Sequence, residues 1–262
     1  MKESKAHHKI NVAGVKISSL EMQDLLLLLN DHIINNIKTR VCITPVNCLT
    51  AAHKSEELKH IYNTADFVLC DGVPVLWASK LLGTPIKERI TGLDFTPIYI
   101  EEAYLRGYSM YFLGAKEGVA EALAHKMQQQ FPAIKILGYY SPPFADKFSE
   151  EENKKMRDQI NALKPDILWV SFTAPKQDYW IYEQMDQLDV KIAVGVGGAF
   201  EVTAGLIDRA PLFFQKNGLE WLYRFMKEPK RLFRRYFIEA PIFIPLVIKQ
   251  RLKRKENFPK TN

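Results

Sequence analysis

The sequence predicts an α/β fold, and three observations lead to this class. Short apolar runs such as residues 41–43 and 67–70 end abruptly in polar residues and a proline or glycine, as buried parallel strands do. Helical segments separate these runs, whereas no strand candidate follows Pro211 and the chain there becomes basic. We therefore expect a doubly wound, mostly parallel, Rossmann-like sheet over residues 1–210 and a helical, basic C-terminal appendage over residues 211–262.

Alternating apolar segments and breaker residues give the expected order of elements. Strands are expected at residues 41–43, 67–70, 109–113, 134–138, 166–171 and 190–194. Helices are expected around residues 25–34 and 56–58 and at 73–82, 94–106, 116–131, 149–163 and 175–187. Residues 10–18 alternate around a glycine and predict a small hairpin or edge strand, after which Ser18 or Ser19 is expected to cap the first helix. Beyond Pro211 we expect short helices broken at Gly218, Pro229, Pro241 and Pro245.

Composition restricts the class of protein. With 262 residues, of which 47% are hydrophobic, the chain can bury a two-sided core. Its three cysteines, at positions 42, 48 and 70, lie in or beside strand-like runs, which favours reduced thiols in a cytosolic setting. Paired Cys or His spacing typical of zinc is absent from the sequence, and residues 1–9 are charged and predict no signal peptide.

Charge is concentrated at the C-terminal end. Residues 1–215 hold 23 Lys and Arg against 26 Asp and Glu, whereas residues 216–262 hold 13 against 4. Basic residues from Arg224 to Arg235 recur at helical spacing among aromatic residues, and an apolar run at 240–248 precedes a second basic cluster. This pattern favours attachment to an anionic membrane surface, the alternative being a solvated helix packed on the main domain. Nucleic acid is the less favoured partner, because no recognition module accompanies the basic residues.

Polar side chains follow the first two expected strands of the sheet. Thr44 and Asn47 come after the first strand and Asp71 after the second, which puts a hydroxyl, an amide and a carboxylate along the rim where α/β proteins bind ligands. The residues alone leave two roles for Asp71, capping of the following helix and catalysis. Arg89 likewise has two roles open, a weak surface salt bridge or a fixed cation for a diphosphate.

Two glycine turns and one helix start complete the candidate site. Residues 112–118 form a strand, a turn at Gly114 and a helix start with Lys116, which favours a diphosphate but lacks the dinucleotide fingerprint. The turn at residues 195–198 either admits a ligand to the backbone at Gly198 or only packs tightly. Gln177 follows the strand at 166–171 and is either a site residue or an ordinary residue of a first helical turn.

An ordered set of motifs spans nearly the whole chain. The set comprises I-T-P-V-N at 43–47, L-C-D-G-V-P at 69–74, E-R-I-T-G-L-D-F at 88–95, F-L-G-A-K-E-G-V-A-E at 112–121, A-P-K-Q-D-Y-W at 174–180, G-V-G-G-A-F at 195–200, D-R-A-P at 208–211 and G-L-E-W-L-Y-R at 218–224. It resembles the WecG/TagA/CpsF family of bacterial glycosyltransferases. The chain departs from the family's G-x-P-K-Q-E motif at Thr173 and Asp178, and has Glu201 where the family usually has aspartate after phenylalanine.

The resemblance implies a function. It implies an inverting hexosyltransferase that moves N-acetylmannosamine or a related sugar from a UDP-sugar to a polyprenyl-diphosphate-linked saccharide, such as undecaprenyl-diphosphate-linked N-acetylglucosamine. The product would enter teichoic acid, common antigen, capsule or exopolysaccharide synthesis. The enzyme would be bacterial and peripheral, on the cytoplasmic face of the plasma membrane, and homo-oligomerisation is left open. Nothing in the sequence resembles a D-x-D metal motif, so we expect no metal, and no cofactor besides the UDP-sugar substrate.

The resemblance also implies residue roles. Asp71 would be the general base, and Thr44 and Arg89 would complete the catalytic set. Arg89 and the appendage arginines would offset charge on the leaving diphosphate. The implied substrate-binding residues are Asn47, Gln177, Gly114, Lys116, Gly138, Gly198, Glu201, Arg224, Arg231 and Arg234.

Two other classes remain as alternatives. A nucleotide-cofactor oxidoreductase would use the same rim, but the missing fingerprint and the basic, apolar tail count against it. A non-catalytic membrane adaptor would have no need of the polar residues along the rim. The presence of Thr44, Asn47 and Asp71 there counts against an adaptor.

Overall fold

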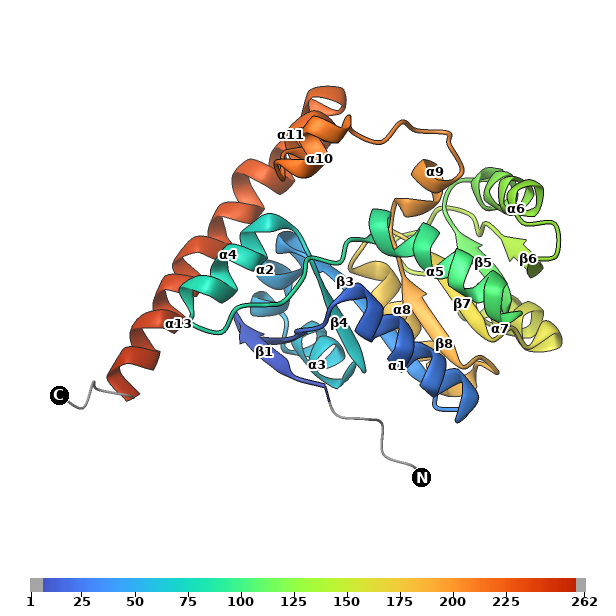
Figure 1. Cartoon of the computed structure of the whole chain (residues 1–262), viewed down its shortest axis with the longest axis horizontal. Helices are drawn as coiled ribbons and strands as arrows, with labels where there is room; N and C mark the ends of the chain where they lie inside the picture. The colour runs from blue at the N-terminus through green and yellow to red at the C-terminus, as the bar shows by residue number, and fades with distance from the viewer. Residues whose placement is uncertain (1–6, 258–262) are drawn as a thin grey trace.

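A six-stranded, all-parallel sheet forms the centre of the protein (Figure 1). The structure is a computed structural model, which describes the backbone of residues 7–257 and the side chains of residues 7–254. Its strands are β3 (Thr39–Pro45), β4 (Phe67–Asp71), β5 (Ser109–Gly114), β6 (Lys135–Tyr140), β7 (Ile167–Ser171) and β8 (Ile192–Gly195). Their order is β4-β3-β8-β7-β5-β6. The predicted α/β class and all six predicted strands are confirmed. Because the strands are parallel, their carboxyl ends lie along one rim.

Helices cover both faces of the sheet. One face carries α1 (Met22–Ile34), α5 (Gly92–Arg106), α6 (Val119–Gln130) and α9 (Ala199–Thr203). The other carries α2 (Val46–Lys54), α3 (Glu56–Thr64), α4 (Val73–Leu81), α7 (Glu150–Leu163) and α8 (Lys176–Gln184). A short 3₁₀ turn, η1 (Met185–Gln187), extends α8. Successive strand residues point to opposite faces, so Ile43 enters the first core and Cys42 the second. The fold is therefore doubly wound, as the alternation of strands and helices predicts.

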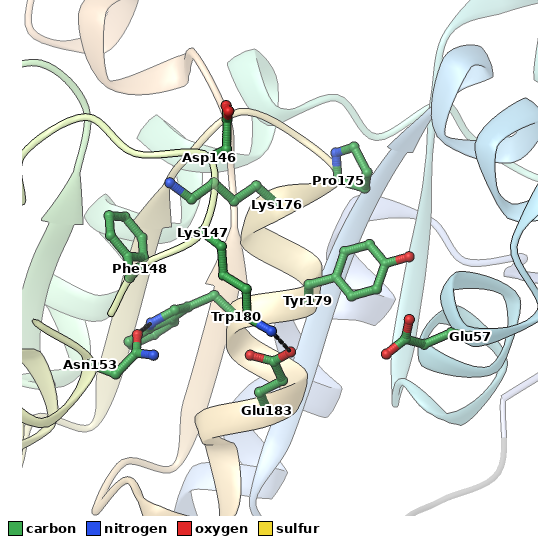
Figure 2. A pocket seen from close by; sticks show the side chains of 10 residues that line it. All are labelled: Glu57, Asp146, Lys147, Phe148, Asn153, Pro175, Lys176, Tyr179, Trp180 and Glu183. Atoms are coloured by element: carbon green, nitrogen blue, oxygen red, sulfur yellow. Dashed lines mark hydrogen bonds and ion pairs between the residues drawn. The ribbon is translucent and has the colours of Figure 1, made fainter. Parts of the chain in front are cut away.

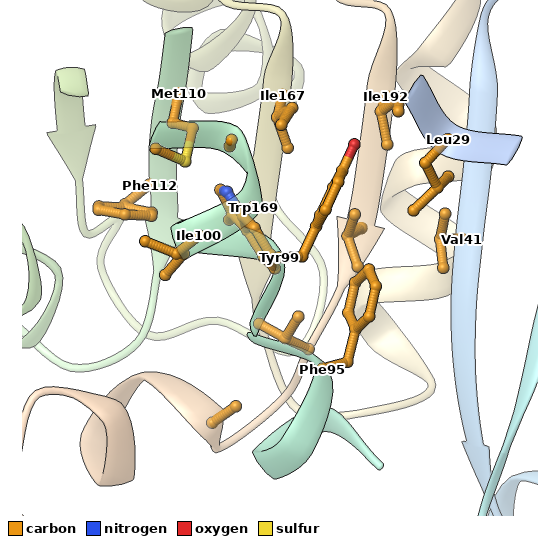
Figure 3. Close-up of a cluster of buried hydrophobic side chains, with 14 of the residues drawn as sticks. Leu29, Val41, Phe95, Tyr99, Ile100, Met110, Phe112, Ile167, Trp169 and Ile192 are labelled. Carbon is orange, nitrogen blue, oxygen red and sulfur yellow. The ribbon is translucent and has the colours of Figure 1, made fainter. Parts of the chain in front are cut away.

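Aromatic rings fill the centre of the first core (Figure 3). Trp169 on β7 meets Phe95 and Tyr99 of α5, with ring centroids 6.0 and 5.7 Å apart. All three side chains are fully buried. Burying a side chain of this size contributes about 1.5–3 kcal/mol. These contacts fix the start of α5 against the sheet, close to the rim where Thr91 caps the helix by accepting a hydrogen bond from the Asp94 N–H.

A hairpin precedes the sheet. Strands β1 (Lys9–Val12) and β2 (Val15–Ser18) pair antiparallel, which confirms the hairpin predicted from residues 10–18. The expected capping by Ser18 or Ser19 is wrong, because α1 starts at Met22 with Glu21 at its N-cap. The two serine hydroxyls instead accept hydrogen bonds from neighbouring backbone, at Val68 and Lys87. The N-terminal stretch in which no signal peptide is expected lies mostly outside the described residues.

Short helical segments follow residue 210. They are α10 (Leu212–Lys216), α11 (Glu220–Lys227), α12 (Pro229–Phe233), the π-helical η2 (Arg234–Glu239), the 3₁₀ turn η3 (Ala240–Ile242) and α13 (Phe243–Asn257). Gly218 separates two of them and Pro229 starts another, as predicted. The predicted break at Pro245 is wrong. This proline occupies the first turn of α13, where a missing N–H breaks no helical hydrogen bond.

Helix α13 packs against the rest of the chain (Figure 1). Its Phe243 and Val247 are buried in the cluster that also holds residues of the hairpin, α2 and α4. Further along, Gln250 accepts a 2.8 Å hydrogen bond from the Ala13 N–H, and Arg254 donates one of 2.6 Å to the Leu82 carbonyl. The appendage is thus anchored to the second face of the sheet at its far end.

Candidate active site

The end of β4 carries Asp71 beside the end of β3. Asp71 is in register with Pro45, and α2 begins at the next residue, so Asn47 of its first turn lies close by along the rim. This is the arrangement expected from the polar residues that end the two strands. Residue 71 is half-buried, so its carboxylate is shielded from bulk water while remaining accessible.

Asp71 does not cap the helix that follows it. Gly72 is the N-cap of α4, with a φ of +124°, and no side chain makes a capping hydrogen bond there. Among the described residues, none donates a hydrogen bond to the Asp71 carboxylate. Of the two roles that the sequence leaves open, capping is therefore excluded in this structure. The carboxylate is free to accept a proton from a ligand.

Three arginines lie near enough to Asp71 to act on its pKa. Burial raises the pKa of the Asp71 carboxyl, and the positive charges of Arg235, Arg89 and Arg224 act in the opposite direction. Arg89 comes from the loop between α4 and α5, whereas Arg224 lies on α11 and Arg235 on η2. The appendage therefore supplies two of the three cations near a carboxylate of the sheet domain.

Arg235 is a residue that the sequence-based site omits. It belongs to the basic, aromatic stretch of the tail, but periodicity alone does not separate it from its neighbours. Arg235 is half-buried, and its charge acts on the pKa of both Asp71 and Cys48. It forms no ion pair within the described part of the chain. A cation in this position is available to an anionic ligand.

An ion network holds Arg89 in place. Glu220 of α11, itself 8% exposed, lies 3.6 Å from Arg89 and accepts a 3.0 Å hydrogen bond from Arg209. Arg209 also donates to Asp94 at 2.6 Å. The sequence leaves open that Arg89 forms only a weak salt bridge on the surface. The structure instead places it in a partly buried ion network. The network joins the start of α5 to α11 and so fixes the appendage over the rim.

Asn47 and Thr44 have different surroundings. The Asn47 Oδ1 atom is buried and has no hydrogen-bond partner among the described residues, so it can accept from a ligand donor. The Thr44 hydroxyl is fully buried and donates to the Leu69 carbonyl at 2.9 Å. Thr44 therefore ties β3 to the end of β4, just before Asp71.

Gln177 supports the glycine turn after β8. Its Oε1 accepts a 2.8 Å hydrogen bond from the Gly197 N–H, and a Cβ on Gly195 would lie 2.8 Å from its Nε2. A Cβ added at Gly198 would lie 3.7 Å from Arg224 Nη2 and 3.8 Å from Glu201 Oε2, so both side chains are close to this glycine. Glu201 Oε2 is buried and has no hydrogen-bond partner in the described chain, so this turn holds an acceptor that a ligand could use.

The remaining predicted residues lie further from Asp71. Gly114, with a φ of +103°, allows β5 to approach β7, since a Cβ there would lie 2.6 Å from the Ser171 carbonyl oxygen. Lys116 follows it and is exposed. Gly138 lies within β6, at the edge of the sheet opposite β4, where a Cβ would meet the ring of Tyr111 at 2.8 Å. The structure does not bring Gly138 to Asp71.

Two appendage arginines are exposed and paired with nearby carboxylates. Arg231 is 62% exposed and contacts Glu228 at 2.5 Å, and Arg234 is 80% exposed and lies 3.1 Å from Glu239. Arg224 differs from them, because its charge acts to lower the pKa of the Asp71 carboxyl. In this structure they are outward-facing charges.

A hollow on the outer side of α8 is separate from Asp71 (Figure 2). Its volume is about 420 Å³, and its lining consists of Glu57, Asp146, Lys147, Phe148, Asn153, Pro175, Lys176, Tyr179, Trp180 and Glu183. Some of its polar groups already have partners: Trp180 donates to Asn153, and Lys176 donates to the Ala145 carbonyl with its ammonium over the Phe148 ring. Lys176 of the A-P-K-Q motif thus anchors the loop after β6.

The part of the chain that the structure describes holds neither a membrane-spanning helix nor a cluster of metal ligands. No helix within residues 7–257 is both long and apolar enough to cross a membrane. Within the same residues, no three His, Cys, Asp or Glu side chains are grouped so that they could hold a metal ion.

Comparisons with known proteins place the chain in a family. Residues 10–257 match the model described as the glycosyl transferase WecG/TagA/CpsF family. A Staphylococcus aureus protein named N-acetylglucosaminyldiphosphoundecaprenol N-acetyl-beta-D-mannosaminyltransferase is 28% identical over 250 residues, 95% of each chain. A Bacillus spizizenii protein of the same name is 31% identical over 198 residues, 76% of this chain and 74% of the relative. The chain belongs to the WecG/TagA/CpsF family of glycosyl transferases.

Proposed function

We propose that this chain is an inverting, UDP-sugar-dependent N-acetylmannosaminyltransferase. Its acceptor is N-acetylglucosamine linked through a diphosphate to undecaprenol, as in the names of its relatives. The observation that carries the proposal is the half-buried Asp71 carboxylate, which has no donor among the described residues and lies near three arginines at the carboxyl rim. One carboxylate and several cations are the groups that this transfer needs.

Asp71 acts as the general base in a single displacement. It takes the proton from the acceptor hydroxyl as that oxygen bonds to the anomeric carbon, and the bond from that carbon to the UDP oxygen breaks with its electron pair leaving on UDP. Attack opposite an α-linked UDP group gives a β-linked product, so configuration inverts. Burial suits this role, since a raised carboxyl pKa approaches the pH at which a general base works best.

Arg89, Arg224 and Arg235 offset the charge that develops on the leaving diphosphate. Fixed cations in a partly buried site stabilise such charge more than mobile ones in water do. The ion pair with Glu220 keeps Arg89 in position before substrate arrives. Exposed Arg231 and Arg234 serve substrate binding in this proposal only after exchanging their carboxylate partners for phosphate.

The other rim residues bind or position. Asn47 and Glu201 offer buried, unpartnered oxygens to sugar hydroxyls. Gln177 and Thr44 hold the β8 turn and the end of β4, and thereby orient the groups that touch substrate. The turn at Gly114 and Lys116 provides backbone N–H groups for a phosphate. Gly138 keeps only a packing role at the opposite edge.

We further propose that residues 211–262 form an appendage that holds the enzyme on the cytoplasmic face of the membrane. The excess of 13 basic over 4 acidic residues in positions 216–262 supports this, since anionic lipid attracts such a segment. No metal or cofactor is part of the proposal.

Ligand stabilisation separates this function from the alternatives. A ligand that binds only the folded state raises its melting temperature. We expect UDP and UDP-N-acetylmannosamine to raise the melting temperature of the full chain and NAD(P)H to leave it unchanged. Stabilisation by NAD(P)H alone would favour an oxidoreductase, and no response to any nucleotide would favour the adaptor.

A further inference from the structure

Helix α4 has an exposed apolar row on its outer side. Trp77 is 65% exposed and Leu81 is 43% exposed, and a spacing of four residues puts them on one face. Val75 and Ala78 on the inner side of the helix, and Leu82 directly after it, are buried in the second core. Most of the Trp77 surface is therefore available to something outside the chain.

Helix α13 repeats this two-sided pattern. Phe243 and Val247 are buried, whereas Ile244, Ile248 and Leu252 form an exposed row at four-residue spacing. Lys249 and Lys253 are exposed and lie beside that row on the helix surface. An apolar stripe flanked by lysines is typical of a helix that lies in a membrane interface.

The two helices share one support. The buried rows of α4 and α13 belong to the same hydrophobic cluster, and Arg254 near the end of α13 donates a 2.6 Å hydrogen bond to the carbonyl of Leu82, directly after α4. The two helices lie side by side in Figure 1. Since each buries its inner row in that cluster, the outer rows both face away from it, and the hydrogen bond from Arg254 keeps the ends of the two helices close together.

We propose that the outer face of α4 is a second membrane contact, with Trp77 inserted into the interface of an anionic bilayer. The proposal rests on the membrane attachment proposed above and extends it from the appendage to the sheet domain. A bilayer fits better than a partner protein because α4 adjoins a strongly basic segment, to which the hydrogen bond between Arg254 and Leu82 ties it, and tryptophan prefers the level of lipid head groups.

This contact would fix the distance between the active site and the membrane surface. Helix α4 begins two residues after Asp71, and Trp77 lies about 6 Å along its axis from the first residue, at 1.5 Å per residue. A bilayer that holds Trp77 therefore also holds Asp71 near the head groups, where the diphosphate of a lipid-linked acceptor lies. The catalytic carboxylate and the acceptor would meet at a fixed depth.

Tryptophan fluorescence gives the test. Trp169 and Trp180 are buried, so the variant Trp221→Phe leaves Trp77 as the exposed tryptophan. With anionic vesicles whose acyl chains are brominated, we expect quenching in Trp221→Phe and loss of that quenching in Trp77→Phe/Trp221→Phe. Co-sedimentation with the vesicles is measured on the same samples.

A kinetic comparison gives an independent readout. Trp77→Ser should raise KM for an undecaprenyl acceptor in vesicles about tenfold, with turnover of a short-chain, water-soluble acceptor unchanged. Leu105→Ser, which alters another exposed apolar residue on α5, is the matched control and should change neither.

The outcomes separate the two proposals. If the Trp221→Phe variant sediments with vesicles but its Trp77 fluorescence is not quenched, the α4 contact is overturned and the appendage remains as the attachment. Failure of the full chain to sediment would overturn membrane attachment itself. A shift from dimer to monomer on Trp77→Ser in the absence of lipid would show that a second copy of the chain covers this face, and would also overturn the proposal.

Discussion

At the scale of single residues, the surroundings of Asp71 account for its proposed role. The carboxylate lies at a strand end, and the turn that follows puts Gly72, not Asp71, at the N-cap of α4. Burial and the three arginines act on its pKa in opposite directions. The net effect is a raised pKa, which makes the carboxylate a stronger base than an exposed aspartate.

The first prediction concerns Arg89. Replacement by lysine keeps the charge but loses the planar fork that binds two phosphate oxygens together. We expect Arg89→Lys to remain well below wild-type kcat/KM, by about tenfold or more, in a steady-state assay of UDP release. Arg89→Lys with full activity would show that a point charge suffices.

The second prediction concerns Arg235. Loss of this cation should lower kcat/KM by about 10²-fold. It should also move the acid limb of the pH profile upward, because the positive charge of Arg235 lowers the pKa of Asp71 and its removal lets that pKa rise. The measurement is kcat/KM against pH for Arg235→Gln, with Lys230→Gln, an exposed residue of α12, as control.

An unchanged pH profile in Arg235→Gln would contradict electrostatic contact with Asp71. Loss of activity in Lys230→Gln to the same extent would mean that the tail acts through its overall charge instead of through one arginine.

At the scale of elements, α8 buries a carboxyl beneath the rim. The Tyr62 hydroxyl donates to Asp178 Oδ2 at 2.9 Å, while burial raises the pKa of the Asp178 carboxyl from 3.8 to about 7. Asp178 is the position at which the chain departs from the glutamate of the family motif. Its location between α3 and α8 indicates a packing role.

The third prediction follows from this pKa. Between about pH 4 and pH 7 the folded state keeps a proton on Asp178 that the unfolded state releases, so stability falls as pH rises through that range and then levels off. At pH 8 Asp178→Asn should be more stable than the wild type by up to about 4 kcal/mol. Denaturant unfolding at pH 5 and pH 8 measures this, and equal pH dependence in both proteins would refute it.

At the scale of the whole molecule, the sheet and its rim were predictable from local sequence. The family resemblance implied that appendage arginines take part in the site, but it did not identify Arg235 as one of them. Each strand is a short apolar run with a breaker at its end, so local sequence locates it, and parallel strands bring Thr44, Asn47 and Asp71 to one rim. Arg235 and Glu220 reach Asp71 and Arg89 only through docking of the tail. That docking depends on contacts such as Phe243 in the second core, which no local pattern reveals.

The same docking affects how the tail can be tested. A deletion from residue 216 would remove Phe243 and Val247 and expose the apolar surface that they cover. Substitution of exposed charges leaves that packing intact. It therefore separates membrane attraction from folding.

The fourth prediction uses such substitutions. Lys249→Gln/Lys253→Gln should weaken partition onto anionic vesicles by roughly 30-fold, at about 1 kcal/mol per basic residue, and added salt should weaken binding of the wild type. Co-sedimentation measures both. Lys154→Gln/Lys155→Gln on α7 removes as much charge from another helix and should have little effect. Salt-independent binding would assign attachment to apolar contacts alone.

Transfer of the sugar by the purified full chain tests the central claim most directly. With UDP-N-acetylmannosamine and a polyprenyl-diphosphate-linked N-acetylglucosamine, we expect stoichiometric UDP release and a β-linked disaccharide by NMR. Asp71→Asn should bind UDP and unfold like the wild type while turnover falls about 10²–10⁴-fold. An Asp71→Asn protein that turns over within a few fold of the wild type, or an α-linked product, would contradict the account.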